Sequence, residues 1–218
     1  MFEKAIEEFN RNGFVLIPDF LTDDEVKELK TTVEKMVDEM DISKERLKTD
    51  STTRPNIDVD AADKIKFFFE EKAFDKNGNL QMDKHRALFR IGFALHALEP
   101  TFKKVTFSDK VKTLVNELGY SEPCVAQSMY IFKNPEVGCR QIPHQDATYL
   151  HALGDEIREI GLWFPMEDAD VCYLYWIFQI IIDFILSLKE ENGTFFHSGL
   201  SQDWTPPSNG SKQIGKRA

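Results

Sequence analysis

The chain has 218 residues, a length typical of one domain with a substantial buried core. Its 37 acidic residues outnumber its 27 basic ones, and the resulting net charge of −10 argues against a nucleic-acid-binding surface, which is basic. The three cysteines are widely spaced and form no CxxC pair, which favours a reducing compartment, and hence the cytoplasm, over a disulfide-stabilised secreted protein.

The first forty residues predict two helices separated by a short strand. Phe2, Ile6 and Phe9 recur at helical spacing, and Gly13 ends this helix. "FVLIPDF" predicts the strand, and "TDDE", beginning at Thr22, predicts the capped start of the second helix. The apolar stripe of that helix is predicted to be core: Val26, Leu29, Val33, Met36, Val37 and Met40.

The remainder of the chain changes from helices to strands. Residues 44–63 are polar and lack periodicity, which predicts a loop, and "KIKFFFEEKAFDKNGNL" predicts a strand followed by a turn. Helices are predicted over 84–97 and, capped by Ser108, over 109–118. "VAQSMYIFK" and "EIGLWFPME" (159–167) are β-branched and aromatic with polar interruptions, so both predict strands. The sequence therefore indicates an α+β domain with a mainly β core and N-terminal helices.

The segment "IPHQDATYLH" (142–151) contains a candidate metal-binding pair. His144 and Asp146 are two residues apart, so on an extended strand both side chains project from the same face. Two histidines and one carboxylate on one face hold Fe(II) in non-haem oxygenases, and this pair would supply two of the three ligands. His151 is too far along the chain to share that strand face, so we interpret it as a loop residue.

Several segments resemble the phytanoyl-CoA dioxygenase family in order and spacing. They are "NGFVLIPDFLTDDEV", "DKIKFFFEEKAFDKNGNL", "IGFALHALEPTFKKVTFSDKV", "QSMYIFKNPEVG", "PHQDATYLH" and "GLWFPMEDA". The resemblance implies a double-stranded β-helix, a jelly roll of the cupin type. It also implies an Fe(II)- and 2-oxoglutarate-dependent dioxygenase that carries out a hydroxylase-type oxidation of a small-molecule substrate with dioxygen. Such a protein is expected to be a monomer when full-length.

The resemblance assigns site residues one by one. His144 and Asp146 correspond to the first two iron ligands. Arg90 stands where close relatives place a basic residue, most often lysine, near the carboxylates of 2-oxoglutarate. Met129 and Trp163 match positions that wall this cosubstrate, and ordinary core packing is the alternative for both.

The resemblance stops before the third iron ligand, a histidine that the family carries on a later strand. We therefore expect a partial, C-terminally truncated domain over 1–169 and a non-homologous or out-of-frame tail over 170–218. The apolar run 171–188 separates "EDA" from "ENG", which the family keeps nearly contiguous, and this favours an insertion such as translated intron sequence. In addition, "FHSGLSQ" can be encoded so that the neighbouring frame reads "FIPGSH", the family's next turn. The alternative is that His197 is the third ligand and Arg217 the carboxylate partner.

Three functional hypotheses follow from the sequence. The first is the 2-oxoglutarate-dependent oxygenase, inactive or impaired in this truncated form. The second is a non-catalytic pseudo-oxygenase that acts as a binding protein. The third is a membrane-anchored protein that uses 171–188, against which Asp183 counts, because an aspartate in mid-membrane costs about 2.5–3.5 kcal/mol. No residue identifies the primary substrate.

Overall fold

The structure is a computed structural model that describes residues 2–43, 47–49, 63–120, 122–138, 159–167, 181–188 and 212–215. Its helices are α1 (Glu3–Asn12), α2 (Asp23–Glu39), the 3-10 helix η2 (Glu71–Ala73), α3 (Lys84–Ala87), α4 (Leu95–Leu98), α5 (Pro100–Thr106) and α6 (Asp109–Glu117). Its strands are β1 (Phe14–Leu16), β2 (Leu47–Thr49), β3 (Ile65–Glu70), β4 (Leu88–Phe93), β5 (Pro123–Ile131), β6 (Glu159–Pro165), β7 (Ile181–Leu188) and β8 (Lys212–Gly215). The mixture of helix and sheet confirms the predicted α+β content.

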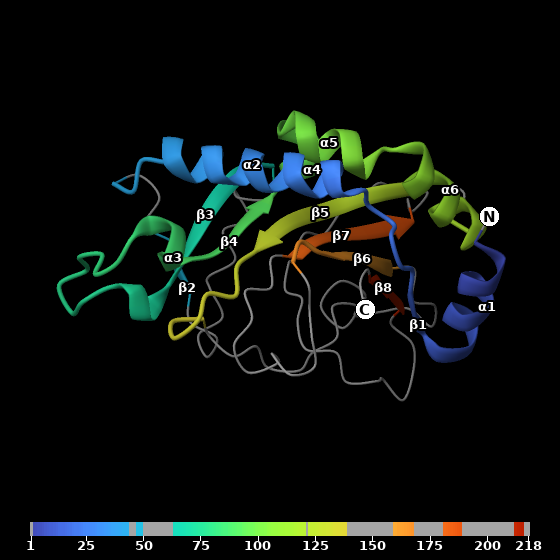
Figure 1. Ribbon diagram of the computed structural model, residues 1–218, viewed down its shortest axis with the longest axis horizontal. Helices are drawn as coiled ribbons and strands as arrows, with labels where there is room; N and C mark the ends of the chain where they lie inside the picture. The colour runs from blue at the N-terminus through green and yellow to red at the C-terminus, as the bar shows by residue number, and fades with distance from the viewer. Residues whose placement is uncertain are drawn as a thin grey trace.

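The strands form one sheet in the order β1-β8-β6-β7-β5-β4-β3-β2. Its central strands, from β6 to β3, are antiparallel, and the outer pairs β1–β8, β6–β8 and β2–β3 are parallel. Helices α2, α4 and α5 lie together on one side of this sheet (Figure 1). The described residues do not contain a second sheet facing the first, so closure into a jelly roll stays a prediction.

Helix α1 ends and helix α2 begins where the sequence predicts. Gly13 follows α1 in the left-handed region at φ 81°, and its N–H donates to the carbonyl of Phe9 at 2.8 Å. Glycine favours this position because it has no Cβ. At the start of α2, the Glu25 N–H donates to the Thr22 hydroxyl, and a Glu25 carboxylate oxygen accepts from the Thr22 N–H at 2.7 Å. This capping box satisfies two backbone donors and sets the start of the helix.

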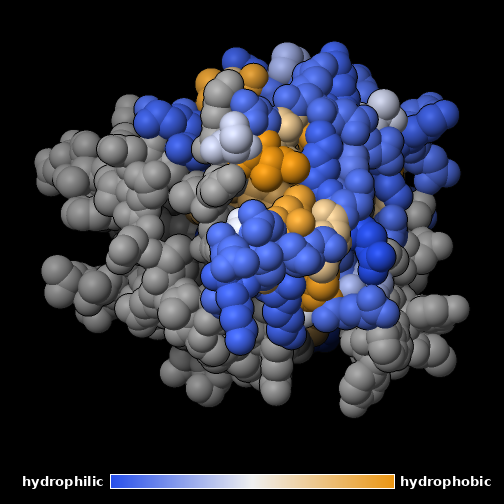
Figure 2. Space-filling view, turned by 90° about the vertical axis from the view of Figure 1, so that its left-hand side faces the viewer, coloured by the Kyte–Doolittle hydropathy of each residue, from blue (hydrophilic) through white to orange (hydrophobic). Residues whose placement is uncertain are grey.

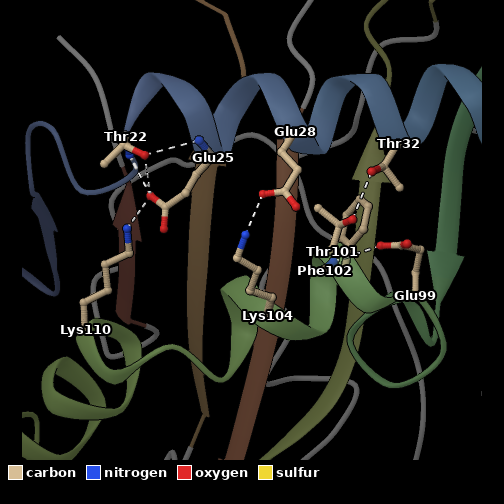
Figure 3. Close-up of polar contacts among 9 residues, drawn as sticks. All are labelled: Thr22, Glu25, Glu28, Thr32, Glu99, Thr101, Phe102, Lys104 and Lys110. Atoms are coloured by element: carbon tan, nitrogen blue, oxygen red, sulfur yellow. Dashed lines mark hydrogen bonds and ion pairs between the residues drawn. The ribbon is translucent and has the colours of Figure 1, made fainter.

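Polar contacts tie α2 to α5 and α6 (Figure 3). Lys110 of α6 donates to the carboxylate of Glu25, and Lys104 of α5 donates to that of Glu28 at 2.8 Å. One turn further along α2, the hydroxyls of Thr32 and Thr101 are 3.0 Å apart. Because most of these side chains are at least partly exposed, the contacts orient the helices more than they stabilise the fold.

Apolar residues pack on both faces of the sheet. The larger cluster lies between the helices and the sheet, and it includes the α2 stripe residues Leu29, Val33, Val37 and Met40, as predicted. Strand residues on this side include Phe69 and Ile91 of β3 and β4 as well as Tyr130, Ile160, Leu162 and Phe164 of β5 and β6. The alternate residues of the same strands belong to a second, smaller cluster of Phe68, Phe89, Met129 and Ile131, against which Phe93 and Trp163 pack. The second cluster therefore lies on the face away from the helices.

The end of the molecule where α2 finishes and α3 begins exposes part of the larger core. Figure 2 shows a narrow hydrophobic area there, bordered by hydrophilic surface. Ile42, Phe74, Leu80 and Met82 are partly buried residues that pack against the larger cluster. Such a fringe of apolar side chains is ordinary for a folded domain.

The helix predicted over 84–97 is wrong. The structure has the short helix α3, then strand β4 from Leu88 to Phe93, then the short helix α4. The segment is a strand because it has a partner on each side: Arg90 is in register with Phe68 of β3 and with Ile131 of β5. Backbone pairing on both edges outweighs a local helical pattern in a segment of aromatic and aliphatic residues.

Two further differences concern helix starts. Helix α5 was not predicted, although Pro100 occupies its first turn and the Glu99 carboxylate accepts from the N–H of Phe102 at 2.9 Å. Helix α6 is confirmed at 109–117, but the Ser108 side chain makes no capping hydrogen bond. Ser108 therefore marks the helix start through its extended backbone alone.

The last difference concerns segments expected to contribute nothing to the sheet. Residues 47–49, within the predicted loop, form β2, which pairs in parallel with β3. In the apolar run, residues 181–188 form β7, which lies between β5 and β6, and residues 212–215 form β8. A non-homologous or out-of-frame origin of the tail stays a prediction, since the pairing of a segment does not reveal its origin.

Candidate functional site

Arg90 is buried at the centre of β4, on the face away from the helices. Its side chain is 2% exposed, and its guanidinium carbon lies 4.7, 5.0 and 5.3 Å from the ring centroids of Phe68, Phe93 and Phe89. Its Nη1 is 3.6 Å from the sulfur of Met129. Arginine keeps its charge at any physiological pH, and the face of an aromatic ring attracts a cation. The cluster is therefore an electropositive, apolar-walled environment in which a carboxylate would be bound strongly.

Met129 and Trp163 belong to the same cluster. Met129 is fully buried and lies in register with Gly92, two residues after Arg90 on β4. Across β7, Met129 and Trp163 are both in register with Asp183, so they lie on one row of the sheet. Trp163 is partly buried and packs against the cluster. The structure thus brings together the three sequence-predicted residues that it describes.

Gly92 leaves the room that Met129 occupies. A Cβ atom on Gly92 would lie 2.9 Å from the Met129 Cγ and 3.5 Å from the Ser128 carbonyl oxygen. Ordinary contacts between carbon atoms are about 3.5–4.0 Å, so any larger residue here would displace Met129. The glycine therefore helps to hold the methionine beside Arg90, a role that its position in the sequence does not reveal.

The two predicted iron ligands lie outside the described residues. The described chain ends at Gly138 before His144 and Asp146 and resumes at Glu159. His151, His197 and Arg217 also lie outside it. Within the described ranges, no group of three histidine, cysteine or acidic side chains is placed to hold a metal ion. The ligand assignment thus stays a prediction.

The turn that leads toward the His-X-Asp pair is anchored to β4. After β5, the N–H of Phe132 donates to the carbonyl of Phe89 at 2.8 Å. The buried side-chain amide of Asn134 donates to the carbonyl of Leu88 at 3.0 Å. These contacts join the chain before His144 to the strand that carries Arg90. Sequence reasoning missed Asn134, because its partners are backbone groups more than forty residues away.

His96, the histidine of α4, is held on the opposite face of the sheet. Its backbone N–H donates to the hydroxyl oxygen of Ser128 at 2.8 Å, and its ring Nδ1 lies 2.8 Å from the same oxygen. One serine hydroxyl thus holds both the backbone and the ring of His96. Ser128 faces the helices, so its neighbours Gln127 and Met129 face the Arg90 side.

The fold and the cluster define an α+β protein whose sheet carries a buried, aromatic-walled cation on the face away from its helices. The sequence model of the phytanoyl-CoA dioxygenase family matches residues 9–172. The chain is 40% identical to the phytanoyl-CoA dioxygenase domain-containing protein 1 homolog of Caenorhabditis elegans over 172 residues, 76% of this chain and 59% of that protein. It is also 40% identical to phytanoyl-CoA dioxygenase domain-containing protein 1 of Mus musculus over 177 residues, 75% of this chain and 59% of that protein. With the phytanoyl-CoA dioxygenase of Arabidopsis thaliana it shares 37% over 164 residues, 74% and 57% of the two chains.

This chain belongs to the phytanoyl-CoA dioxygenase family. It spans about three-fifths of the length of the curated relatives it matches. The match includes Arg90, Met129 and Trp163, as well as the His144-X-Asp146 pair. In the part of the chain that the structure describes, no helix is long and apolar enough to cross a membrane.

Proposed function

We propose that this protein is an Fe(II)- and 2-oxoglutarate-dependent dioxygenase that oxidises a small molecule. The observation that carries the proposal is the burial of the Arg90 guanidinium on the sheet face away from the helices, among three phenylalanine rings and a methionine. Such a cation suits one carboxylate of 2-oxoglutarate, which it binds through charge-assisted hydrogen bonds. Family membership supports the same cosubstrate.

Met129, Phe93 and Trp163 would form the walls around the bound cosubstrate. Their packing beside Arg90 lowers the local dielectric constant, and this strengthens the attraction between the guanidinium and a carboxylate. Because the walls are apolar, they also keep water away from that ion pair. The residues of this cluster therefore bind and orient the diacid and take no part in proton transfer.

His144 and Asp146 would hold the iron. An imidazole and a carboxylate are the donor types of the 2-His-1-carboxylate set, so the residues present fit Fe(II) as two of its three ligands. When bound, Fe(II) supplies the activation of dioxygen for oxidation of the substrate. The family's third ligand, a histidine, is not among the matched and described residues, and His197 is the alternative candidate within this chain.

The proposal is tested by the affinity for 2-oxoglutarate, titrated anaerobically in the presence of Fe(II). A hydrogen bond to a charged group contributes about 1.5–3 kcal/mol, so Arg90→Ala should raise Kd by roughly 10- to 150-fold. Arg90→Lys keeps the charge and should change Kd by less than about fivefold. Arg86→Ala is the matched control, because Arg86 is an exposed arginine four residues away that pairs with Glu136. Equal affinity in the wild type and Arg90→Ala would remove Arg90 from the site.

A non-catalytic binding protein is the second candidate function. The observation in its favour is that Arg90, Met129 and Trp163, the described residues proposed to bind 2-oxoglutarate, lie together on one sheet face and need no metal to bind a carboxylate. On this hypothesis, 2-oxoglutarate binds through Arg90, but no decarboxylation of 2-oxoglutarate accompanies binding. Measuring carbon dioxide release alongside the titration separates the two functions.

A further inference from the structure

A second buried polar group lies on the same face of the sheet as Arg90. The side chain of Gln127, on β5, is 3% exposed. A register shift between Val125 and Gln127 marks a bulge, after which the side chains alternate regularly. Gln127 is therefore on the face of Met129, whereas Ser128 points to the helices and contacts His96.

The amide nitrogen of Gln127 has no hydrogen-bond partner among the described residues. Natural proteins pair nearly all of their buried polar groups, so each unpaired group calls for an explanation. A glutamine that served only to fill the core would be replaced by methionine or leucine without loss. The buried, unpaired N–H group thus indicates a ligand that brings the missing acceptor.

Gln127 and Arg90 lie at different levels along the sheet. Arg90 is in register with Ile131, four residues along β5 from Gln127. With about 3.3 Å per residue and about 4.8 Å between strands, the Cα atoms of Arg90 and Gln127 are roughly 14 Å apart. An extended five-carbon diacid is only about 7 Å long, by ordinary bond lengths. A diacid held at Arg90 thus covers about half of the separation between the two Cα atoms, and the Arg90 guanidinium covers part of the rest, since it reaches Met129, two residues from Gln127.

We propose that Gln127 orients the primary substrate by donating a hydrogen bond from its amide nitrogen to a neutral oxygen acceptor, such as an amide, ester or thioester carbonyl. The proposal rests on the proposed function, because it assigns the region beyond Met129 to the molecule that is oxidised. A neutral acceptor is the better match, because the uncharged amide does not offset the cost of burying a second anion. The same face then binds two molecules: the diacid at Arg90 and the substrate carbonyl at Gln127.

The test is NMR of the full chain, with N-methylacetamide as a minimal neutral carbonyl probe and acetate as its anionic counterpart. N-methylacetamide should shift the side-chain NH₂ resonance of Gln127 saturably in the millimolar range expected of so small a fragment. Acetate should leave that resonance in place. The exposed side-chain amide of Gln81, which donates to the carbonyl of Asn79, is the matched control and should respond to neither.

Two variants complete the test. Gln127→Met removes the donor with little change of volume, so the apparent Kd for N-methylacetamide should rise at least about tenfold, while Gln81→Met leaves it unchanged. Because Gln127→Met also removes an unpaired buried group, its melting temperature should equal or exceed that of the wild type. A melting temperature of Gln127→Met clearly below that of the wild type would overturn the proposal. So would a Gln127 side-chain resonance that does not shift when N-methylacetamide is added.

The two proposals are separated by 2-oxoglutarate in the same experiment. It should shift the side-chain Nε–H resonance of Arg90 and leave the side-chain NH₂ of Gln127 unchanged. A missing response at Arg90 contradicts the proposed function. A response of Gln127 to 2-oxoglutarate contradicts the assignment of Gln127 to the primary substrate.

Discussion

Replacing Gly92 with alanine should displace Met129 and so disturb the proposed carboxylate-binding cluster around Arg90. The new Cβ would lie 2.9 Å from the Met129 Cγ, whereas carbon atoms in contact are about 3.5–4.0 Å apart. Met129 is fully buried against Phe68 and Phe89, so it has to shift by roughly 0.6–1 Å in a packed environment. Its sulfur is 3.6 Å from Arg90, and the shift therefore reaches the guanidinium.

The expected loss of stability follows from two opposing contributions. Overpacking of a core costs about 1–3 kcal/mol, and Gly→Ala returns about 0.4–1 kcal/mol by restricting the unfolded chain. Gly92→Ala should therefore lower the free energy of unfolding by about 1–2 kcal/mol and also weaken 2-oxoglutarate binding. Urea denaturation measures the first effect, and anaerobic titration measures the second.

Gly119→Ala is the control for a loss of stability without damage to the cluster. Gly119 has φ +93° after α6, and apart from its chain neighbours no atom of the described residues lies within 4 Å of the position that its Cβ would take, so alanine there costs about 1 kcal/mol through backbone strain alone. Its affinity for 2-oxoglutarate should equal that of the wild type.

Met129→Ala should relieve the clash, so the Gly92→Ala/Met129→Ala double variant should lose less stability than the sum of the single variants. Full additivity, or unchanged stability and affinity in Gly92→Ala, would refute the reasoning.

Two further predictions concern pH and metal. Burial raises the pKa of Glu25, but hydrogen bonds from Lys110 and Thr22 outweigh it and leave the pKa below its usual 4.5. The stability that this lowered pKa contributes is present above pH 4.5 and is lost as pH falls through the lowered pKa. Glu25→Gln should therefore reduce the dependence of the unfolding free energy on pH in the acid range, and it should cost roughly 1 kcal/mol at pH 7. Parallel plots of unfolding free energy against pH for the two proteins would contradict this. His144→Ala should abolish retention of Fe(II), measured by metal analysis after gel filtration, because Asp146 alone is a weak ligand; undiminished iron would rule out this ligand assignment.

Local chemistry explains why the first forty residues were largely predictable. The capping box at Thr22 and the glycine after α1 act within a few residues, so the local sequence is enough to predict the start of α2 and the end of α1. The apolar stripe of α2 is equally predictable, because apolar residues repeated every 3.6 residues lie on one face of a helix. The His-X-Asp pair is recognised for the same reason, since its meaning depends on a spacing of two residues.

The segment around Arg90 shows where such reasoning fails. Residues 88–93 were predicted to be helical, and only the pairing with β3 and β5 makes them a strand. That pairing joins residues 19 or more positions apart along the chain, so no local pattern reveals it. The error matters for the site, because in a helix Arg90 would have had different neighbouring residues.

The sequence by itself determined the end of α1, the start of α2, the apolar stripe of α2, the family and the choice of candidate site residues, because each depends on neighbours in the chain or on motif order. Tertiary structure alone decided that the charge of Arg90 is buried among aromatic rings and that Met129 and Trp163 share its face. It also decided that Gln127 is buried on that face with an unpaired amide nitrogen in the described part of the chain. These properties depend on strand register, and register is set by contacts between segments that are distant in sequence.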